Sequence, residues 1–299
     1  MCPLCSGGLN TPARKVSDPI TGEKFEIACC SECRIAMTLP APARIETYYR
    51  ERYYGNRHSF TGRLCNWRRR RLVARHISPS AGARLLDLGS GDGAFLDTAS
   101  AAGWTAVGVE PHHRPDEGKH AIFRTLEQAA TLAPYDCVTM WHVLEHVPAP
   151  VECLAQLRSI LSPTGVLLLA VPDFGGLQAR VFGGHWLHLD VPRHLYHFTA
   201  RSLPRLLNTA GFEVLRTAHQ EFEYDCFGWI QSALNAIGPT PNVLFDALTG
   251  KPPRVGRFAV GAAYVAGSLI APAAAALTAA STLLHRGGTI IVAARPRPR

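Results

Sequence analysis

The chain has 299 residues, of which 47% are hydrophobic and 18% are charged, so it can bury a sizeable core and is not a disordered chain. The formal net charge is +8 and is carried almost entirely by arginine. This charge fits an anionic partner, such as nucleic acid, anionic lipid or an acidic substrate, and it equally fits the arginine-rich composition of a GC-rich genome.

Residues 1–45 carry two Cys-x-x-Cys pairs and only one short strand-like run, Lys24–Ile27. Each pair can place two thiolates on one side of a tight turn, and two such turns complete a tetrahedral site of four sulfur ligands. Because no export signal opens the chain, we expect a metal in a reducing compartment rather than disulfides. The predicted ligands of a structural zinc ion are Cys2, Cys5, Cys30 and Cys33, and Cys29 is a spare thiol that fits less well. A unit this small needs the metal to fold.

Residues 46–82 are predicted to form a helical linker or lid. They include an aromatic cluster (Tyr48, Tyr49, Tyr53, Tyr54) and a basic amphipathic stretch from Asn66 to Ile77. The run Arg68–Arg71 in that stretch fits a solvated helix face. Lipid head groups, a phosphorylated acceptor and RNA are its alternative partners.

Short apolar runs then alternate with helical segments, which is typical of an α/β fold with a parallel sheet. The predicted strands are Arg84–Asp87, Ala106–Glu110, Ile122–Arg124, Cys137–Met140, Gly165–Val171, Phe212–Ala218 and Thr289–Ala294. Helices are predicted over Pro148–Leu161 and Ser202–Ala210, the second ending before Gly211.

Residues 226–284 interrupt this pattern before the last strand with two apolar runs, Phe227–Leu248 and Phe258–Leu284. The second run has no charged residue, and we expect Pro272 to break it. A helical hairpin lying on or dipping into a membrane fits this insert, because its two flanks must return to the same sheet. A buried helical subdomain and a homodimer interface are the alternatives.

The strongest motif is the loop Asp87-Leu88-Gly89-Ser90-Gly91-Asp92-Gly93, which follows an apolar strand and precedes a helix. Its glycines allow a sharp turn and the close approach of a ligand. The loop lacks the lysine of a phosphate-binding loop and the spacing of a dinucleotide loop. Glu110 ends the next strand, where an acid accepts hydrogen bonds from both ribose hydroxyls of a nucleotide-like cofactor.

With these motifs and the stretch Tyr135–Pro148, the chain resembles class I S-adenosylmethionine-dependent methyltransferases of the bacterial small-molecule group, here with an N-terminal zinc ribbon. The resemblance runs from about Tyr48 to Arg295, apart from the insert. It implies an α/β fold with a Rossmann-like seven-stranded mixed sheet and helices on both faces. To this fold the sequence adds the N-terminal zinc-ribbon-like unit (1–45) and the helical apolar insert (226–284), so that the methyltransferase domain comprises 83–225 and 285–299. The segment between Glu110 and the third strand is shorter than in the family.

The resemblance also implies the residues around S-adenosylmethionine. The glycine loop would lie against the methionine end, Glu110 would bind the ribose, and Thr125-Leu126 would lie at the adenine edge. Trp141 and His142 would be near the sulfonium. The complete set of expected cofactor-binding residues is Asp87, Gly89, Ser90, Gly91, Gly93, Glu110, Thr125, Leu126, Trp141 and His142.

Two histidine clusters are candidates for the chemistry, since a poorly acidic hydroxyl acceptor needs a base. His194 is the first candidate for a general base and His142 the second, with His146 beside it. Arg193 is a candidate ligand for an acceptor carboxylate or phosphate. The string Glu145-His146 also resembles metal-dependent O-methyltransferases, in which a divalent ion polarises the hydroxyl. The ligands here would be His142, Glu145 and His146, with His194 or His197 as a fourth.

We therefore expect an enzyme that methylates a small or lipid-linked acceptor, on a hydroxyl of a sugar, glycan or quinone-like group. The alternatives are an RNA methyltransferase and a non-catalytic module that keeps the cofactor pocket. We expect a cytoplasmic protein, peripheral at the inner membrane if the insert binds lipid, and no nucleic acid partner, because no basic stretch interleaved with aromatic residues is present.

Overall fold

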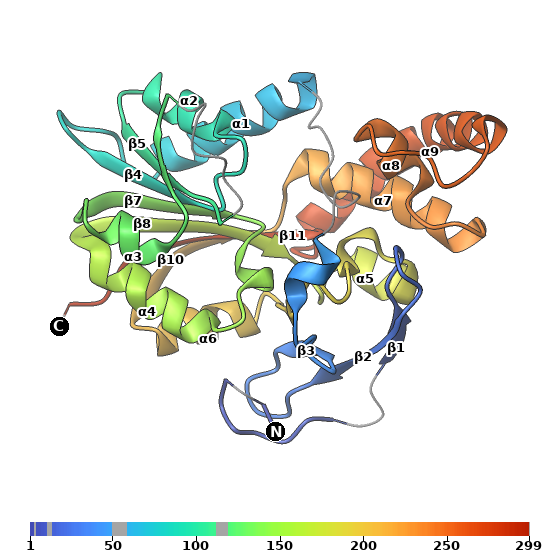
Figure 1. Ribbon diagram of the computed structural model, residues 1–299, viewed down its shortest axis with the longest axis horizontal. Helices are drawn as coiled ribbons and strands as arrows, with labels where there is room; N and C mark the ends of the chain where they lie inside the picture. Colours follow the sequence, from blue (N-terminus) through green and yellow to red (C-terminus); the bar gives the residue numbers. More distant parts are fainter. Residues whose placement is uncertain (3, 11–13, 50–58, 112–118, 299) are drawn as a thin grey trace. The chain divides into compact units, whose positions relative to one another are not determined.

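The computed structural model describes residues 1–299 except 3, 11–13, 50–58, 112–118 and 299 (Figure 1). The chain forms two compact units. The first unit comprises Met1–Thr61, Pro172–Leu203 and Ala218–Ile290. The second comprises Gly62–Val171, Pro204–Thr217 and Ile291–Arg299. The predicted zinc-ribbon-like segment and the apolar insert thus fall in the same unit.

A seven-stranded sheet in the order β10-β11-β8-β7-β4-β5-β6 is the framework of the second unit. Its strands are β4 (Arg84–Leu88), β5 (Thr105–Val109), β6 (Ala121–Phe123), β7 (Tyr135–Trp141), β8 (Leu161–Pro172), β10 (Phe212–Ala218) and β11 (Thr289–Pro296). The pairs β4–β5, β5–β6, β4–β7 and β7–β8 are parallel. All seven predicted strands are present, and the α/β fold with a Rossmann-like mixed sheet is confirmed.

The central strands are largely apolar, because helices cover both faces of the sheet. Leu85, Leu86, Val138 and Leu167 are completely buried. The helices of this unit are α1 (Ser59–Ala74), α2 (Ala94–Ser100), α3 (Leu126–Ala130), α4 (Pro150–Ile160) and α6 (Ser202–Thr209). In Figure 1, α1 and α2 lie on one face of the sheet, and α3 and α4 lie on the other.

The segment 46–82 contains less described helix than predicted. The 3₁₀ helix η1 (Ile45–Tyr48) precedes a stretch outside the described residues, and α1 then ends at Ala74. Tyr53 and Tyr54 of the predicted aromatic cluster lie outside the described residues, as does the short segment after Glu110.

A small antiparallel sheet forms the N-terminal part of the first unit, in the order β1-β2-β3-β9. The strands are β1 (Arg14–Ser17), β2 (Lys24–Cys29), β3 (Ala36–Leu39) and β9 (Tyr196–His197). Val16, Phe25 and Ile27 share a hydrophobic core with Trp186 and Val191, together with Ala36, Ala179 and Leu189. The N-terminal sheet therefore does not depend on a metal alone for its folding, because it also packs on residues 179–191.

The remaining short helices are η2 (Leu144–His146) in the second unit, and α5 (Leu177–Phe182), η3 (Gly183–His185) and η4 (Leu187–Leu189) in the first.

The apolar insert forms three helices: α7 (Phe222–Ile237), α8 (Val243–Leu248) and α9 (Arg257–Leu283). The expected break at Pro272 is wrong, because α9 runs through this residue. Proline removes only one backbone hydrogen bond, and the run Ala273–Ala276 that follows it favours the helix.

Candidate active site

The carboxyl ends of β4, β5 and β7 meet at one edge of the sheet, where parallel α/β folds bind ligands. Asp87 near the end of β4 is buried, and its Oδ1 accepts a 2.6 Å hydrogen bond from Oγ1 of Thr139 on β7. This bond ties the two strands together beneath the glycine loop.

The three glycines of the loop all have left-handed backbone angles, with φ of 77° at Gly89, 55° at Gly91 and 77° at Gly93. Such angles strain any residue with a Cβ atom. Gly89 is also closely covered, because a Cβ there would collide with Cγ2 of Val143. The loop thus needs glycine for its conformation, and at Gly89 for space as well.

Glu110 follows β5 and lies directly beside the loop. The N–H of Gly91 donates to its Oε2 at 3.1 Å, and the Glu110 N–H donates to the Phe123 carbonyl at 2.8 Å. The carboxylate is thereby held at the junction of β5, β6 and the loop, where the ribose of a nucleotide-like cofactor would be bound.

Ser90 faces inward from the loop. Its side chain is buried over Gly108 of β5, and its N–H donates to the Val109 carbonyl at 3.1 Å. Within the described chain its Oγ has no hydrogen-bond partner. Ser90 fits here because Gly108 has no side chain, and the sequence alone did not indicate this contact.

Trp141 ends β7 and is buried between two side chains from different helices. Its ring makes an edge contact with Phe95 at 5.8 Å, and the Arg69 guanidinium lies over it at 5.0 Å. The indole Nε1 has no hydrogen-bond partner among the described residues. Arg69 is itself buried, so the run Arg68–Arg71 is not one solvated helix face.

His142 follows Trp141 in a left-handed conformation, with φ of 58°. Its N–H donates to the Ala170 carbonyl at 2.9 Å, and its Nδ1 lies 3.7 Å from Oε1 of the buried Glu145. Left-handed residues other than glycine cluster at functional sites. His142 and Glu145 are thus brought together after β7, and His146 follows in η2.

Thr125 and Leu126 begin α3, immediately after β6. The Thr125 hydroxyl accepts a hydrogen bond from the Gln128 N–H, and the Gln128 side chain reaches back to complete a capping box. Leu126 is buried. The structure thus shows a helix-start role for this pair, and their cofactor contact stays a prediction.

His194 belongs to the first unit and is buried. Its Nδ1 lies 2.9 Å from the His188 carbonyl oxygen, which can only accept, so Nδ1 carries the proton. The basic lone pair of the neutral ring is therefore on Nε2. The Thr38 hydroxyl donates to the His194 carbonyl at 2.7 Å and fixes this loop on β3.

His197 is a structural residue rather than a free ligand for a metal. Since Thr38 uses its proton on the His194 carbonyl, its oxygen accepts from Nε2 of His197 at 3.0 Å. Burial, with the nearby charge of Arg14, lowers the pKa of His197 to about 3, so the ring is neutral.

The sequence suggested that Arg193 binds a carboxylate or phosphate of the acceptor, but in the structure it is paired with two carboxylates of its own chain. It is completely buried and donates to Asp18 at 2.7 Å and to Asp190 at 2.8 Å. Burial alone would raise the pKa of Asp18, but the hydrogen bond and charge of Arg193 outweigh burial and lower it. Arg193 therefore holds the β1–β2 turn on the loop before β9.

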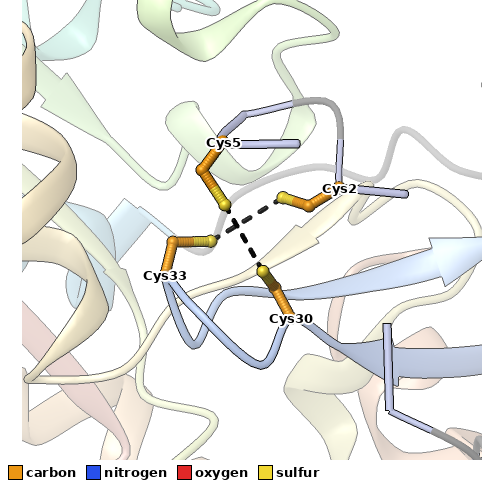
Figure 2. A group of neighbouring side chains, drawn as sticks. All are labelled: Cys2, Cys5, Cys30 and Cys33. Carbon is orange, nitrogen blue, oxygen red and sulfur yellow. Dashed lines mark hydrogen bonds between the residues drawn. The ribbon is translucent and has the colours of Figure 1, made fainter. Parts of the chain in front are cut away.

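The four predicted zinc ligands converge in the first unit (Figure 2). Cys2 and Cys33 have their sulfur atoms 3.7 Å apart, and those of Cys5 and Cys30 are 3.4 Å apart. All four sulfur atoms lie within 4.8 Å of one another. Cys29 lies outside this group, with its thiol donating to the Cys30 carbonyl.

Comparison with known sequences identifies the family of this chain. The family described as "Methyltransferase domain" matches residues 57–217, more than half of the chain. A tRNA U34 carboxymethyltransferase of Edwardsiella ictaluri is 31% identical over 172 residues, covering 52% of each chain. One from Pseudoalteromonas translucida is 33% identical over 117 residues, 35% of this chain and 36% of its own. The chain thus spans about half or less of these relatives.

Among solved structures, phosphoethanolamine N-methyltransferase 2 of Haemonchus contortus in complex with S-adenosyl-L-methionine has a TM-score of 0.51. It is 14% identical and covers 88% of this chain and 62% of its own, so the likeness concerns the fold. The glycine loop and Glu110 fit S-adenosyl-L-methionine. The loop offers a left-handed backbone without side chains, and the Glu110 carboxylate is held beside it at the strand ends. The chain belongs to the methyltransferase domain family and is an S-adenosylmethionine-dependent methyltransferase with the class I fold.

Proposed function

We propose that this enzyme transfers the methyl group to a hydroxyl of a small or lipid-linked acceptor, sugar-, glycan- or quinone-like, at the cytoplasmic membrane face. The observation that carries the proposal is His194. Its Nδ1–H is held by the His188 carbonyl, which leaves Nε2 as the basic nitrogen. A neutral imidazole in a fixed tautomer is suited to remove a hydroxyl proton.

S-adenosylmethionine supplies a methyl group on a cationic sulfur, which an oxygen can attack in line. The chain's own residues then hold the cofactor in position. Glu110 would accept hydrogen bonds from the ribose hydroxyls, and the loop Gly89–Gly93 would lie along the methionine part. Trp141 and His142 would border the methyl group, and His194 would take the proton from the acceptor.

Replacement of His194 tests this role. His194→Gln should lower kcat by roughly 10²- to 10⁴-fold, which is the usual contribution of a general base. Cofactor affinity measured by calorimetry should stay unchanged. His185→Gln, in the same unit, is the matched control. Unaltered turnover in His194→Gln would remove the base from the proposal.

The acceptor class can be found by supplying S-adenosylmethionine labelled in its methyl group. Three separate pools would be offered: a bacterial lipid extract, nucleotide sugars and bulk tRNA. The proposal expects label in the lipid or sugar pool, stable to mild base if an ether has formed. Label in tRNA alone would contradict it.

RNA methylation is the second candidate, because the relatives of this chain include enzymes named for tRNA U34. Arg70 and Arg71 are exposed on α1 and give this candidate some positive surface. If RNA is the acceptor, affinity for tRNA should fall steeply between about 50 and 200 mM salt. Replacing both arginines by glutamine should flatten that dependence.

We further propose that Cys2, Cys5, Cys30 and Cys33 hold a structural zinc ion. Four sulfur atoms at about 2.3 Å from zinc in a tetrahedron are roughly 3.8 Å apart, close to the 3.4 and 3.7 Å found here. A site of four thiolates has no open position for chemistry. Purified protein should therefore contain one zinc per chain by elemental analysis.

Replacing two ligands tests the zinc proposal. Cys2→Ser with Cys5→Ser should remove the zinc and make the N-terminal sheet sensitive to protease, whereas Cys29→Ser should keep both zinc and resistance. Zinc-free wild-type protein with a resistant N-terminal sheet would contradict the proposal.

A further inference from the structure

Helix α9 turns its large apolar side chains toward solvent. Phe258, Val265, Leu269 and Leu283 are all strongly exposed. At about 100° per residue they fall within roughly 40° of one another and form one stripe along the helix. By length and composition α9 is long and apolar enough to cross a membrane, and few of its residues are buried.

The opposite side of α9 carries small and polar residues. Its buried residues are Gly267, Ala274, Thr278 and Ser281, which point away from the apolar stripe. Gly267 sits tightly against neighbouring helices, because a Cβ there would lie 2.7 Å from Leu244 of α8 and 3.4 Å from Ile230 of α7. Small residues at the helix contact and large apolar residues outside are the arrangement of helices that face lipid.

Helix α7, which packs along α9, buries Trp229 and also three polar residues, Gln231, Ser232 and Asn235. These polar side chains are hydrogen-bonded to their surroundings. The Gln231 amide donates to Asn235 at 2.8 Å, and Ser232 accepts from the Leu187 N–H at 2.9 Å. Ile237 at the end of α7 is exposed. Buried polar groups beside an exposed Ile237 are the reverse of what a helix on a water-exposed surface usually shows.

Basic residues lie at both ends of this apolar stripe. No acidic residue follows Asp246 in the chain, and the exposed Arg257 and Arg286 lie at the two ends of α9. Basic residues at the rim of an apolar helix attract the anionic head groups of a bilayer. We infer that the outward stripe of α9 is embedded in the surface of an anionic lipid bilayer.

The helix is placed to lie in the bilayer surface rather than to cross it. Before α9, Arg254 donates to the carbonyls of Pro19 and Pro241 and pairs with Asp246 at 2.9 Å. After α9, Thr289 donates to Asp225 at the start of α7 at 2.9 Å. Both ends are thus fixed to the same unit, and only one side of the helix is left for lipid.

Vesicle binding by the full-length protein tests this inference. The protein should sediment with phosphatidylcholine vesicles containing phosphatidylglycerol, and less with phosphatidylcholine alone. Val265→Asp with Leu269→Asp should weaken binding by roughly tenfold or more, since charge is placed in the apolar stripe. The matched control is Val181→Asp on α5, because Val181 is 64% exposed and Val265 is 63% exposed. It should bind like wild type.

The inference deepens the membrane part of the proposed function, and the two can fail separately. The double variant should unfold at the wild-type temperature, which shows that it is folded, and calorimetry with S-adenosylmethionine should give the wild-type affinity. Wild-type protein that ignores both vesicle types, or a double variant that binds them undiminished, would overturn the inference. So would a dimer in sedimentation analysis that the double variant converts to monomers without any lipid binding.

Discussion

Gly89 is constrained both by its backbone angle and by the side chain that covers it. Its φ is +77°, and Val143 occupies the space that a Cβ would need. Gly82 has a φ of +78° but nothing within 4 Å of the same position. Gly82→Ala should therefore cost only about 1 kcal/mol of stability, from strain alone.

Gly89→Ala should cost more than Gly82→Ala, by roughly 1–3 kcal/mol for the forced displacement of Val143, and it should weaken cofactor binding. Urea unfolding and calorimetry on both variants would measure this. Equal losses of stability with unaltered cofactor affinity would show that Val143 moves aside freely.

His197 makes stability depend on pH. Its folded pKa is lowered to about 3 by burial, against an ordinary value of 6.5. The contribution of its neutral ring is therefore present above about pH 6.5 and is lost as the pH falls toward 3, by up to about 1.4 kcal/mol per pH unit.

His197→Gln should remove this dependence. Between pH 7.5 and 5 the wild type should lose more unfolding free energy than the variant. Asp225 has the opposite tendency, because burial and the nearby Glu221 raise its pKa to about 7, but it is present in both proteins and cancels in the difference. Parallel pH curves would show that His197 is not neutral in the folded state.

Among the elements, Arg193 joins the turn between β1 and β2 to the loop before β9. Arg193→Met would leave the buried Asp18 without its cation and should cost about 3–5 kcal/mol. Arg193→Met with Asp18→Asn should cost less than the two single losses added together. Protease cleavage near the β1–β2 turn and urea unfolding would both report this, and additive losses would contradict the coupling.

The sheet was predictable from the sequence, because strands buried on both faces contain continuous apolar runs, such as Val166–Val171 of β8. β10 has the predicted bounds, Phe212–Ala218. The ribbon was less visible, since β1 and β3 have four residues each and β9 has two. Strands this short have no period to detect, and β9 pairs with a strand some 160 residues before it.

At the site, the sequence predicted the residues that belong to local motifs. It missed the residues that tertiary packing brings next to them. Asp87, the glycines and Glu110 form one continuous pattern along the chain. Arg69 reaches Trp141 from a helix more than 70 residues earlier. A run of four arginines shows no preferred member until the helix is placed on the sheet. Val143 over Gly89 likewise depends on the loop after β7.

For the whole molecule, segments that are distant in sequence combine in the first unit. The cysteine-containing sheet, the loop with His194 and the apolar helices are parts of one compact unit. Changes in the ribbon should therefore reach the His194 loop through Thr38, which bonds to both His194 and His197. Thr38→Val should lower turnover without weakening cofactor binding, as judged by kcat and calorimetry. Unchanged turnover would separate the ribbon from catalysis.

This chain should bind and use S-adenosylmethionine through the loop Gly89–Gly93 and Glu110. Titration calorimetry of the full-length protein with S-adenosylmethionine tests it most directly. One cofactor should bind per chain, and Glu110→Gln should weaken binding by roughly tenfold, the loss of one or two hydrogen bonds to a charged group. Glu152→Gln, an exposed acid on α4, should bind as wild type does. Absence of binding to the wild-type protein would show that the loop and Glu110 do not form a cofactor site.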